Sequence, residues 1–355
     1  MIKVEVNASK SYNVLIGPGL IKQGGEKIKT LHPKVQAVAI VTDKTVEKLY
    51  LKALEKALSQ ARLKTHAYII PAGESSKNGT EYLALLEWLN QKKITRSDCI
   101  VALGGGVVGD LTGFAAATHL RGTPYIQIPT TLLAMVDSSV GGKTAINLES
   151  GKNLAGIFNQ PSCVLCDTDV LSTLPKEVFS DGMAEVIKYG MLDNAKLLDQ
   201  LQNEPLSDNL EQIIATCVSM KRDIVQQDEF DKGERQLLNF GHTVGHAIER
   251  LSNYEISHGY AVAIGMMIET GMAVKQSLCP SECLNILEKL LYKYDLPIHT
   301  DFNANELLEA AMYDKKRTGD KITIVTPCAI GKCELKTIPV DELYNWIEMG
   351  LKACK

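Results

Sequence analysis

Three histidines lie close together in the second half of this 355-residue chain, which has only seven histidines in all. The segment Asn239-Phe-Gly-His-Thr-Val-Gly-His-Ala-Ile-Glu249 places His242 and His246 four residues apart, so a helix would carry both rings on one face. His258 follows after a break at 252–257. Imidazole binds metal ions and moves protons near pH 7. The cluster therefore favours a metal site, with a satisfied core pair as the alternative.

A carboxylate that could complete such a site is Glu185. It stands in the otherwise apolar helical stretch Asp181–Tyr189, and Lys188 follows on the same helix face. A carboxylate is rarely buried without a partner, and two histidines with one glutamate suit Zn²⁺ with a position left for substrate. A metalloprotease motif would need glutamate directly after the first histidine, where this chain has Thr243.

A second candidate site is the glycine-rich segment Leu103-Gly-Gly-Gly-Val-Val-Gly-Asp110, which follows a predicted strand and begins a helix. Glycines let backbone amides approach a pyrophosphate, and the helix amino terminus adds partial positive charge. Asp43, the segment 71–77 and the segment 129–131 end other predicted strands, on the side where open α/β sheets bind ligands. We therefore expect a dinucleotide site here. A tight turn without a ligand is the alternative.

The formal net charge of −4 argues against a general nucleic-acid-binding protein, so an anionic ligand would need a local cluster of cations. For most single lysines a solvated surface position is the ordinary interpretation. Lys188 is the exception, because it shares a helix face with Glu185. Lys143, in Gly141-Gly-Lys-Thr144, can place its ammonium beside a phosphate, although the first glycine of a P-loop is absent.

The composition is that of an ordinary globular protein, with no apolar run long enough to span a membrane. The first residues alternate like a strand and lack the apolar core of a signal peptide, so we expect a cytoplasmic protein. Nine cysteines do not suggest a disulfide framework. Cys163 and Cys166 lie on a predicted buried strand with their side chains on opposite faces, which predicts core thiols.

Hydrophobic periodicity divides the chain in two. Strand-like runs in the first half are Ile2–Val6, Tyr12–Ile16, Val35–Thr42, His66–Ile70, Ile100–Leu103 and Tyr125–Ile128, with helical patterns at Val46–Ala61 and Thr80–Lys92. This alternation predicts a mostly parallel sheet covered on both faces, with the first two strands as a possible edge hairpin. Later helical patterns are Lys176–Leu192, Leu210–Gln227, Gly241–Leu251, Ala261–Gln276, Pro280–Tyr294 and Ala304–Lys316, with one β pair at Lys321–Thr326 and Cys333–Ile338.

We therefore expect an α/β amino-terminal nucleotide-binding domain with a mostly parallel sheet, residues 1–170. A mainly α-helical domain for metal and substrate follows, residues 171–355.

Several segments together resemble 3-dehydroquinate synthase, a family of the sugar phosphate cyclase superfamily. They occur in the family's order over nearly the whole chain: Gly104–Asp110, Arg121–Gly122, Ile128–Thr131, Val136–Ala145, Gly151–Leu154, Met183–Tyr189 and Leu238–Glu249. The segments 137–143 and 238–249 are the most specific. The chain departs from the family at Tyr260, Glu234 and His119, none of which removes an expected ligand.

The resemblance implies a role for individual residues. The expected ligands of a Zn²⁺ or Co²⁺ ion are Glu185, His242 and His258. NAD contacts fall to Asp43, Glu74, Lys77, Gly104, Gly105, Gly106, Gly109, Asp110, Thr130, Thr131, Lys152, Leu171, Ser172, Thr173 and Leu174. Catalytic contacts fall to Lys143, Lys188, Lys221, Arg235, Asn239 and His246, and further substrate contacts to Asp137, Asn153, Lys315 and Lys316. Arg121 would reach the phosphate site of a neighbouring subunit in a homodimer.

The implied reaction converts 3-deoxy-D-arabino-heptulosonate 7-phosphate into 3-dehydroquinate and phosphate in the shikimate pathway. It proceeds by transient oxidation, β-elimination, re-reduction and intramolecular aldol closure, so NAD is regenerated. His246 or the leaving phosphate would be the elimination base. Alternatives are another sugar phosphate cyclase, an iron-type NAD-dependent alcohol or polyol dehydrogenase, and a non-catalytic nucleotide-binding protein.

Overall fold

The computed structural model describes residues 1–312, 317–318 and 320–354. The chain forms two compact units, Met1–Leu174 with Ile214–Phe230, and Pro175–Ile213 with Asp231–Lys355. Lys315 and Lys316, two predicted substrate contacts, lie outside the described residues. In the described part of the chain, no helix combines the length and the apolar character needed to cross a lipid bilayer.

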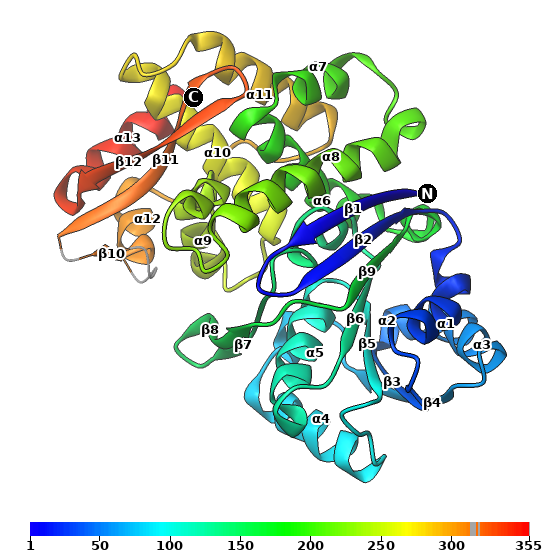
Figure 1. The fold of residues 1–355 in the computed structure, drawn as a ribbon. Helices are drawn as coiled ribbons and strands as arrows, with labels where there is room; N and C mark the ends of the chain where they lie inside the picture. Colours follow the sequence, from blue (N-terminus) through cyan, green and yellow to red (C-terminus); the bar gives the residue numbers. More distant parts are fainter. Residues whose placement is uncertain (313–316, 319, 355) are drawn as a thin grey trace. The chain divides into compact units, whose positions relative to one another are not determined.

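The first unit is built on a seven-stranded sheet with the order β1-β2-β9-β6-β5-β3-β4 (Figure 1). Its strands are β1 (Ile2–Asn7), β2 (Ser11–Gly17), β3 (Ala37–Asp43), β4 (Lys64–Ile70), β5 (Cys99–Gly104), β6 (Tyr125–Pro129) and β9 (Cys163–Asp167). β1 and β2 form an antiparallel hairpin at the edge, and all other neighbours pair in parallel. The predicted mostly parallel sheet and its edge hairpin are therefore confirmed.

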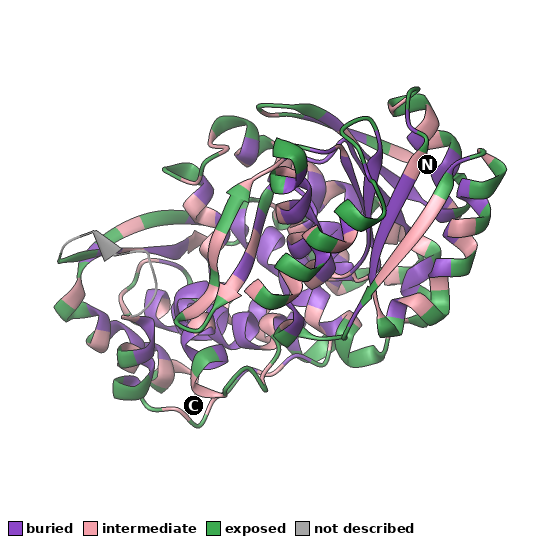
Figure 2. Cartoon of the chain, turned by 90° about the horizontal axis from the view of Figure 1, so that it is seen from below, coloured by how far each residue is buried: buried purple, intermediate pink, exposed green. Residues whose placement is uncertain are grey.

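Helices cover both faces of this sheet, as the continuous apolar strands predicted (Figure 2). Ala39 and Val41 of β3 join a core cluster with α4 (Gly79–Gln91) and α5 (Gly106–Thr118). Val38 and Ile40 point the other way and are also fully buried. α1 (Leu20–Leu31) and α3 (Lys52–Gln60) pack on each other. α1 also packs against β9, and α3 against β4. In the chain, α2 (Lys44–Val46) and a π-helical turn at Glu47–Leu51 connect β3 to α3. Cys163 and Cys166 are buried thiols on β9, as expected.

Two features of the first unit were not predicted. One is a separate antiparallel hairpin, β7 (Lys143–Leu148) and β8 (Gly151–Phe158), which packs against α5. No residue of β8 is fully buried, so the strand lacks the alternation of buried apolar and exposed polar residues that identifies a strand from sequence. The other is the return of Ile214–Phe230, which includes the second half of α8 (Leu206–Gln227), to this unit. Contacts between segments that are distant in sequence, not the local sequence, assign Ile214–Phe230 to the first unit.

The second unit is mainly helical and is organised around α10 (His258–Lys275), in which every residue from Ala261 to Ala273 is buried. Packed on it are α6 (Lys176–Asp193), α9 (His242–Leu251), α11 (Ser281–Lys293) and α13 (Leu343–Ala353). The unit also contains α7 (Ala195–Asn203), α12 (Ala304–Ala311) and the antiparallel strands β10 (Arg317–Thr318), β11 (Lys321–Ala329) and β12 (Lys332–Pro339). The predicted helical region and its β pair are confirmed, but β10 adds a third strand and α10 begins at His258 instead of Ala261.

α9 and α10 approach each other so closely that glycine is needed at the contact. A Cβ built on Gly265 of α10 would lie 2.0 Å from the carbonyl oxygen of Gly241 and 2.9 Å from the amide nitrogen of Gly245. Both atoms belong to the backbone and cannot move aside as a flexible side chain can. This contact sets the distance between the two helices that carry the predicted histidine ligands.

We predict that Gly265→Ala destabilises the protein by about 1–3 kcal/mol, because the added methyl group forces α9 and α10 apart. A thermal melt followed by circular dichroism would show a midpoint several degrees below that of the parent. Gly79→Ala is the matched control, because a Cβ at that position in α4 meets no atom within 4 Å. Equal midpoints for Gly265→Ala and the control would show that the contact is not tight.

Candidate metal centre and nucleotide site

Three predicted metal ligands meet within the second unit. Glu185 lies in the middle of α6, while His242 and His258 are the first residues of α9 and α10. Glu185 Oε1 is 3.7 Å from His242 Nε2 and 3.6 Å from His258 Nε2. Two ligand atoms on one tetrahedral Zn²⁺, with bonds of about 2.1 Å, lie about 3.4 Å apart. The donor atoms therefore have the types and spacing that suit one such ion.

The other oxygen of Glu185 contacts the ammonium group of Lys188, one helical turn along α6. Both side chains are almost completely buried, at 0% and 1% exposed. A buried charge is costly unless it is paired, so the ion pair explains how these residues occur in an apolar helix. The contact places Lys188 beside Glu185, as their shared helix face predicted.

Hydrogen bonds orient both histidine rings in the same sense. His242 Nδ1 is 3.0 Å from the carbonyl oxygen of Phe240, and His258 Nδ1 is 3.1 Å from Glu249 Oε2. A carbonyl and an ionised carboxylate only accept hydrogen bonds, so Nδ1 is the donor in each ring. The lone pair of each neutral ring is then on Nε2, the nitrogen that faces Glu185. This arrangement is typical of histidines that bind metal ions.

The two carboxylates also act on the charge of His258. Burial lowers the pKa of His258, but hydrogen bonds and charges from Glu185 and Glu249 outweigh burial and raise the pKa to about 10. A metal ion at Nε2 would have to displace the proton held there, since only the unprotonated nitrogen binds.

His246 lies beside the other two histidines. Its ring centroid is 5.3 Å from that of His242 and 6.0 Å from that of His258. A second set of donors, His246, Glu249 and His258, also falls within 4.8 Å. The structure therefore brings together the three histidines that the sequence singled out, and two overlapping sets of donors share His258.

The amino terminus of α9 is supported by a carboxylate from α10. Gly241, with a φ of 77°, donates its backbone N–H to Glu269 Oε2 at 2.8 Å.

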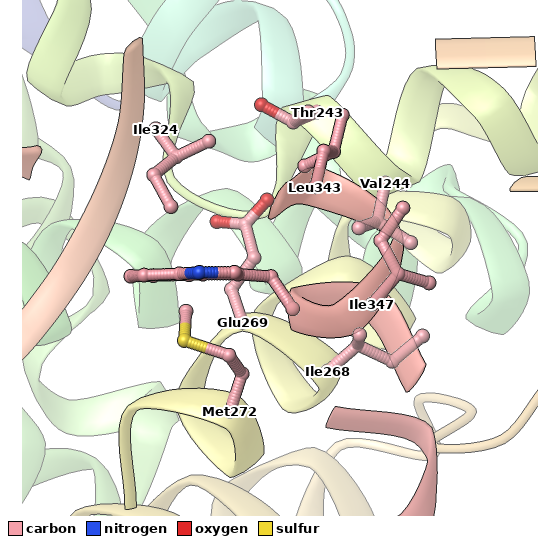
Figure 3. A pocket seen from close by; sticks show the side chains of 9 residues that line it. Thr243, Val244, Ile268, Glu269, Met272, Ile324, Leu343 and Ile347 are labelled. Carbon is pink, nitrogen blue, oxygen red and sulfur yellow. The ribbon is translucent and has the colours of Figure 1, made fainter. Parts of the chain in front are cut away.

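Glu269 lines a small cavity with mostly apolar side chains, among them Ile324 and Met272 (Figure 3). The cavity volume is about 20 Å³, which is enough for about one water molecule and too small for a sugar phosphate.

In the first unit, predicted nucleotide contacts lie at one edge of the sheet. Asp43 and Gly104 end the neighbouring parallel strands β3 and β5, and Thr130 follows β6. β4 lies on one side of β3 and β5 on the other, so the strand order reverses at this point. Open α/β sheets bind ligands at such switch points. The Asp43 carboxylate accepts hydrogen bonds from the backbone N–H groups of Thr45 and Val46.

The glycine-rich turn after β5 has packing reasons of its own. A Cβ on Gly105 would lie 3.2 Å from Thr131, and one on Gly106 would lie 3.1 Å from Ser138 Oγ. On Gly109 it would lie 2.6 Å from Gln127 Oε1. These contacts support the tight-turn interpretation.

One observation nevertheless favours a ligand at this turn. Thr130 Oγ1 is buried, and it has no hydrogen-bond partner among the described residues. A bound group with a donor or acceptor would satisfy it, so the residues fit a nucleotide.

Three other predicted nucleotide contacts form one ion-pair cluster. Lys77 Nζ is 2.8 Å from Asp110 Oδ2 and 3.6 Å from Glu74 Oε1, and Asn147 Nδ2 donates to Glu74 Oε1 at 2.7 Å. Burial lowers the pKa of Lys77, but the charges of Asp110 and Glu74 outweigh burial and raise it. Burial raises the pKa of Asp110 against the opposing charge of Lys77. The cluster joins the segment before α4 to α5 and β7.

A second ion pair in the first unit joins two predicted substrate residues. Lys221 of α8 donates to the backbone oxygen of Asp137 at 2.7 Å and to its Oδ1 at 2.9 Å. Asp137 lies in a π-helical turn, Ala134–Ser138, and 84 residues separate the two in sequence. No sequence pattern indicated this pairing.

The remaining predicted contacts are placed as follows. Lys143, Lys152 and Asn153 lie on the β7–β8 hairpin, and Asn153 has a φ of 54° and donates its N–H to Asn147 Oδ1. Arg121 is exposed and has a φ of 64°. Arg235 is buried and Asn239 half-buried in the 3₁₀ turn before α9. Leu171, Ser172 and Thr173 lie in the 3₁₀ turn Thr168–Thr173, and Leu174 follows it.

Glu249 and Asn147 are among the residues in these contacts that were not assigned a role from the sequence. Glu249 holds His258 Nδ1, and Asn147 links Glu74 to the hairpin. Glu249 had a signal, because it is seven residues after His242 and so lies on the same face of α9. Asn147 had none, since the hairpin itself was not predicted.

Comparisons with known proteins agree with this geometry. The model of the 3-dehydroquinate synthase amino-terminal domain matches residues 67–181, and that of the carboxy-terminal domain matches residues 182–317. A 3-dehydroquinate synthase from Clostridium kluyveri is 41% identical over 354 residues, covering 98% of each chain. One from Enterococcus faecalis is 42% identical, covering 95% of this chain and 96% of its own.

Solved structures show the same fold. 2-Deoxy-scyllo-inosose synthase complexed with carbaglucose-6-phosphate, NAD⁺ and Co²⁺ has a TM-score of 0.88 at 27% identity, covering 99% of this chain and 100% of its own. 2-Epi-5-epi-valiolone synthase from Streptomyces hygroscopicus with NAD⁺ and Zn²⁺ bound has a TM-score of 0.85 at 25% identity, covering 99% of each chain. The two domain models and the curated relatives show that the chain belongs to the 3-dehydroquinate synthase family.

Proposed function

We propose that this protein is a 3-dehydroquinate synthase, a lyase that depends on NAD and a divalent metal. It converts 3-deoxy-D-arabino-heptulosonate 7-phosphate into 3-dehydroquinate and phosphate, in the shikimate pathway of aromatic amino acid biosynthesis. The observation that carries this proposal is the meeting of Glu185, His242 and His258 around one point, with Lys188 on the same carboxylate. The chain that forms it is 41% identical, over nearly its whole length, to a protein of that name.

Sequence identity separates this proposal from two of its three alternatives, another sugar phosphate cyclase and an iron-type dehydrogenase. The inosose and valiolone synthases are 27% and 25% identical to this chain, well below the 41–42% of the 3-dehydroquinate synthases. An iron-containing alcohol dehydrogenase is only 15% identical with a TM-score of 0.69, so it shares the fold alone. A dehydrogenase would also have little use for cations such as Lys143, Lys152, Lys188 and Lys221.

The metal is proposed to be Zn²⁺ or Co²⁺, the ions in the two solved cyclases. Glu185, His242 and His258 would hold it, because their donor atoms and spacing suit one tetrahedral ion. A bound divalent ion supplies Lewis acidity, which polarises a substrate oxygen. Lys188 balances the charge of Glu185 at the oxygen that does not face the histidines.

The nucleotide is proposed to lie at the carboxyl ends of β3, β5 and β6. Asp43 ends β3, the triple glycine follows β5, and the buried Thr130 hydroxyl after β6 lacks another partner in the described chain. The Glu74–Lys77–Asp110 cluster would hold the polar part of the cofactor in place. NAD⁺ supplies reversible hydride transfer, so it acts catalytically and is regenerated.

Lysine and arginine side chains would bind the two anionic groups of the substrate, its phosphate and its carboxylate. Two of them are already oriented: Lys188 by Glu185 and Lys221 by Asp137. His246 lies against both histidine ligands, where it could take up a proton or orient the leaving phosphate. Lys143, Asn153, Arg235 and Asn239 complete the proposed set, and Lys152 stays a proposed NAD contact. Lys315 and Lys316 stay predictions from the family resemblance.

Two further predictions concern the protein as a whole. A homodimer is proposed because Arg121 is exposed on a turn with left-handed backbone, where it could reach a neighbouring subunit. A cytoplasmic location also stays a prediction.

We predict that the purified protein, mixed with the heptulosonate phosphate, catalytic NAD⁺ and Zn²⁺, releases phosphate and dehydroquinate in equal amounts. NADH would not accumulate, because each turnover returns the hydride. Phosphate is measured colorimetrically and the carbocycle by chromatography. Stoichiometric NADH from an alcohol without phosphate release would instead identify a dehydrogenase.

We predict that Lys188→Ala lowers kcat at least ~100-fold, the effect of removing one electrostatic contact to the reacting groups. Circular dichroism and metal content would report whether the fold and the metal centre remain. Lys176→Ala is the matched control, since Lys176 lies on the same helix but is 72% exposed. If Lys188→Ala turned over as fast as this control, Lys188 would have no part in the reaction.

We predict that a chelator abolishes turnover, and that added Zn²⁺ or Co²⁺ restores it. The physical reason is that Glu185, His242 and His258 provide one site, which these ions occupy reversibly. Metal content is measured by elemental analysis before and after treatment. Undiminished activity of protein shown to be metal-free would refute the metal requirement.

A further inference from the structure

Glu249 is a buried carboxylate to which the proposed reaction gives no role. It lies near the end of α9, and its side chain is only 3% exposed. Two helical turns separate it from His242, so it lies on the face of α9 that also carries His246. Its Oε2 is 3.1 Å from His258 Nδ1. This places it behind one of the proposed metal ligands, at the ring nitrogen that does not face Glu185.

The two nitrogens of His258 face different sets of donors. Nε2 lies 3.6 Å from Glu185 Oε1, in the set formed by Glu185, His242 and His258. Nδ1 faces Glu249, which belongs with His246 and His258 to the second set. In a neutral imidazole one nitrogen carries the proton, so only the other can bind an ion. The position of that proton therefore decides which set is open.

An ionised carboxylate accepts hydrogen bonds and cannot donate them. Glu249 thus keeps a proton on Nδ1, so the proton that a metal ion displaces is the one on Nε2, the nitrogen that faces Glu185. We propose that Glu249 is a positioning residue that selects the Glu185–His242–His258 set by fixing the tautomer and orientation of His258. The inference rests on the proposed metal-dependent function and adds to it a residue that touches no reacting group.

His242 shows why this role matters more at His258. The ring of His242 is held by the backbone oxygen of Phe240, and its side chain is 11% exposed. The side chain of His258 is 32% exposed, so fewer packing contacts fix its ring. A carboxylate that orients a histidine ligand in this way typically changes metal affinity about 10–100-fold when it is removed.

The test compares metal-free parent protein with Glu249→Ala, Glu249→Gln and Glu255→Gln. Glu255→Gln is the control for lost charge, since Glu255 is exposed and three residues from His258. Each protein is titrated with Co²⁺ while visible absorption is recorded, and Zn²⁺ affinity is measured by competition with a chelator. Thermal melts of the metal-free proteins report any general loss of structure.

We expect Glu249→Ala to bind Zn²⁺ about 10–100-fold more weakly and to shift the Co²⁺ absorption bands. Glu249→Gln should lie between Glu249→Ala and the parent, because its amide oxygen still accepts from Nδ1. Should Glu249→Ala not fold, Glu249→Gln alone still decides, since it keeps the shape of the side chain. Glu255→Gln should match the parent in affinity and spectrum.

Other outcomes overturn the proposal in recognisable ways. Parent-like affinity and spectrum in both Glu249 variants would show that the hydrogen bond positions nothing. Complete loss of Co²⁺ in both Glu249→Gln and His246→Ala would make Glu249 a ligand of the second set. If the parent itself bound no Co²⁺, the proposed metal-dependent function would fail together with this inference.

Discussion

The carboxylate of Glu185 is fully buried, and it faces the ammonium group of Lys188 at one oxygen and the imidazoles of His242 and His258 at the other. A charge in such a place must be compensated, because the cost of removing it from water is several kcal/mol. Lys188 compensates part of it, and the histidines leave room for a cation. The same electrostatic demand therefore explains a charged pair inside an apolar helix, and it would favour the proposed metal ion at the oxygen that faces the histidines. The remaining features of the second unit position the groups that meet this demand.

The positions of His242 and His258 depend on where α9 and α10 begin. Each of the two proposed histidine ligands is the first residue of its helix, so its backbone position follows from the start of that helix. Glu269 binds the backbone N–H of Gly241 before α9, and Asp181 of α6 binds the backbone N–H of Gly259 at the start of α10. The close contact at Gly265 then fixes the separation of the two helices. Carboxylates thus have three roles in this unit: Glu185 is a proposed metal ligand, Glu269 and Asp181 support the starts of helices, and Glu249 accepts a hydrogen bond from a histidine ring.

The first unit shows a different way of assembling polar groups. Parallel strands bring their carboxyl ends to one edge, so residues that follow β3, β5 and β6 become neighbours although they lie far apart in sequence. Ion pairs then add side chains from other elements, as Lys77 with Asp110 and Lys221 with Asp137. In each pair the lysine side chain is already ordered by the carboxylate. A ligand that bound to the lysine would therefore cost little further side-chain entropy.

Local patterns in the sequence determined much of this protein: the parallel sheet with its edge hairpin, the helical second half, the glycine-rich turn, and the face of α6 shared by Glu185 and Lys188. These follow from periodicities of two and 3.6 residues, which are properties of neighbouring positions. The spacing of His242, His246 and His258 could only indicate a cluster. Tertiary structure alone decided which nitrogens face Glu185, that Glu249 holds His258, that the 143–158 segment forms a hairpin, and that Lys221 meets Asp137. The physical reason is that these contacts join segments from different elements, and their geometry is set by packing that no short stretch of sequence contains.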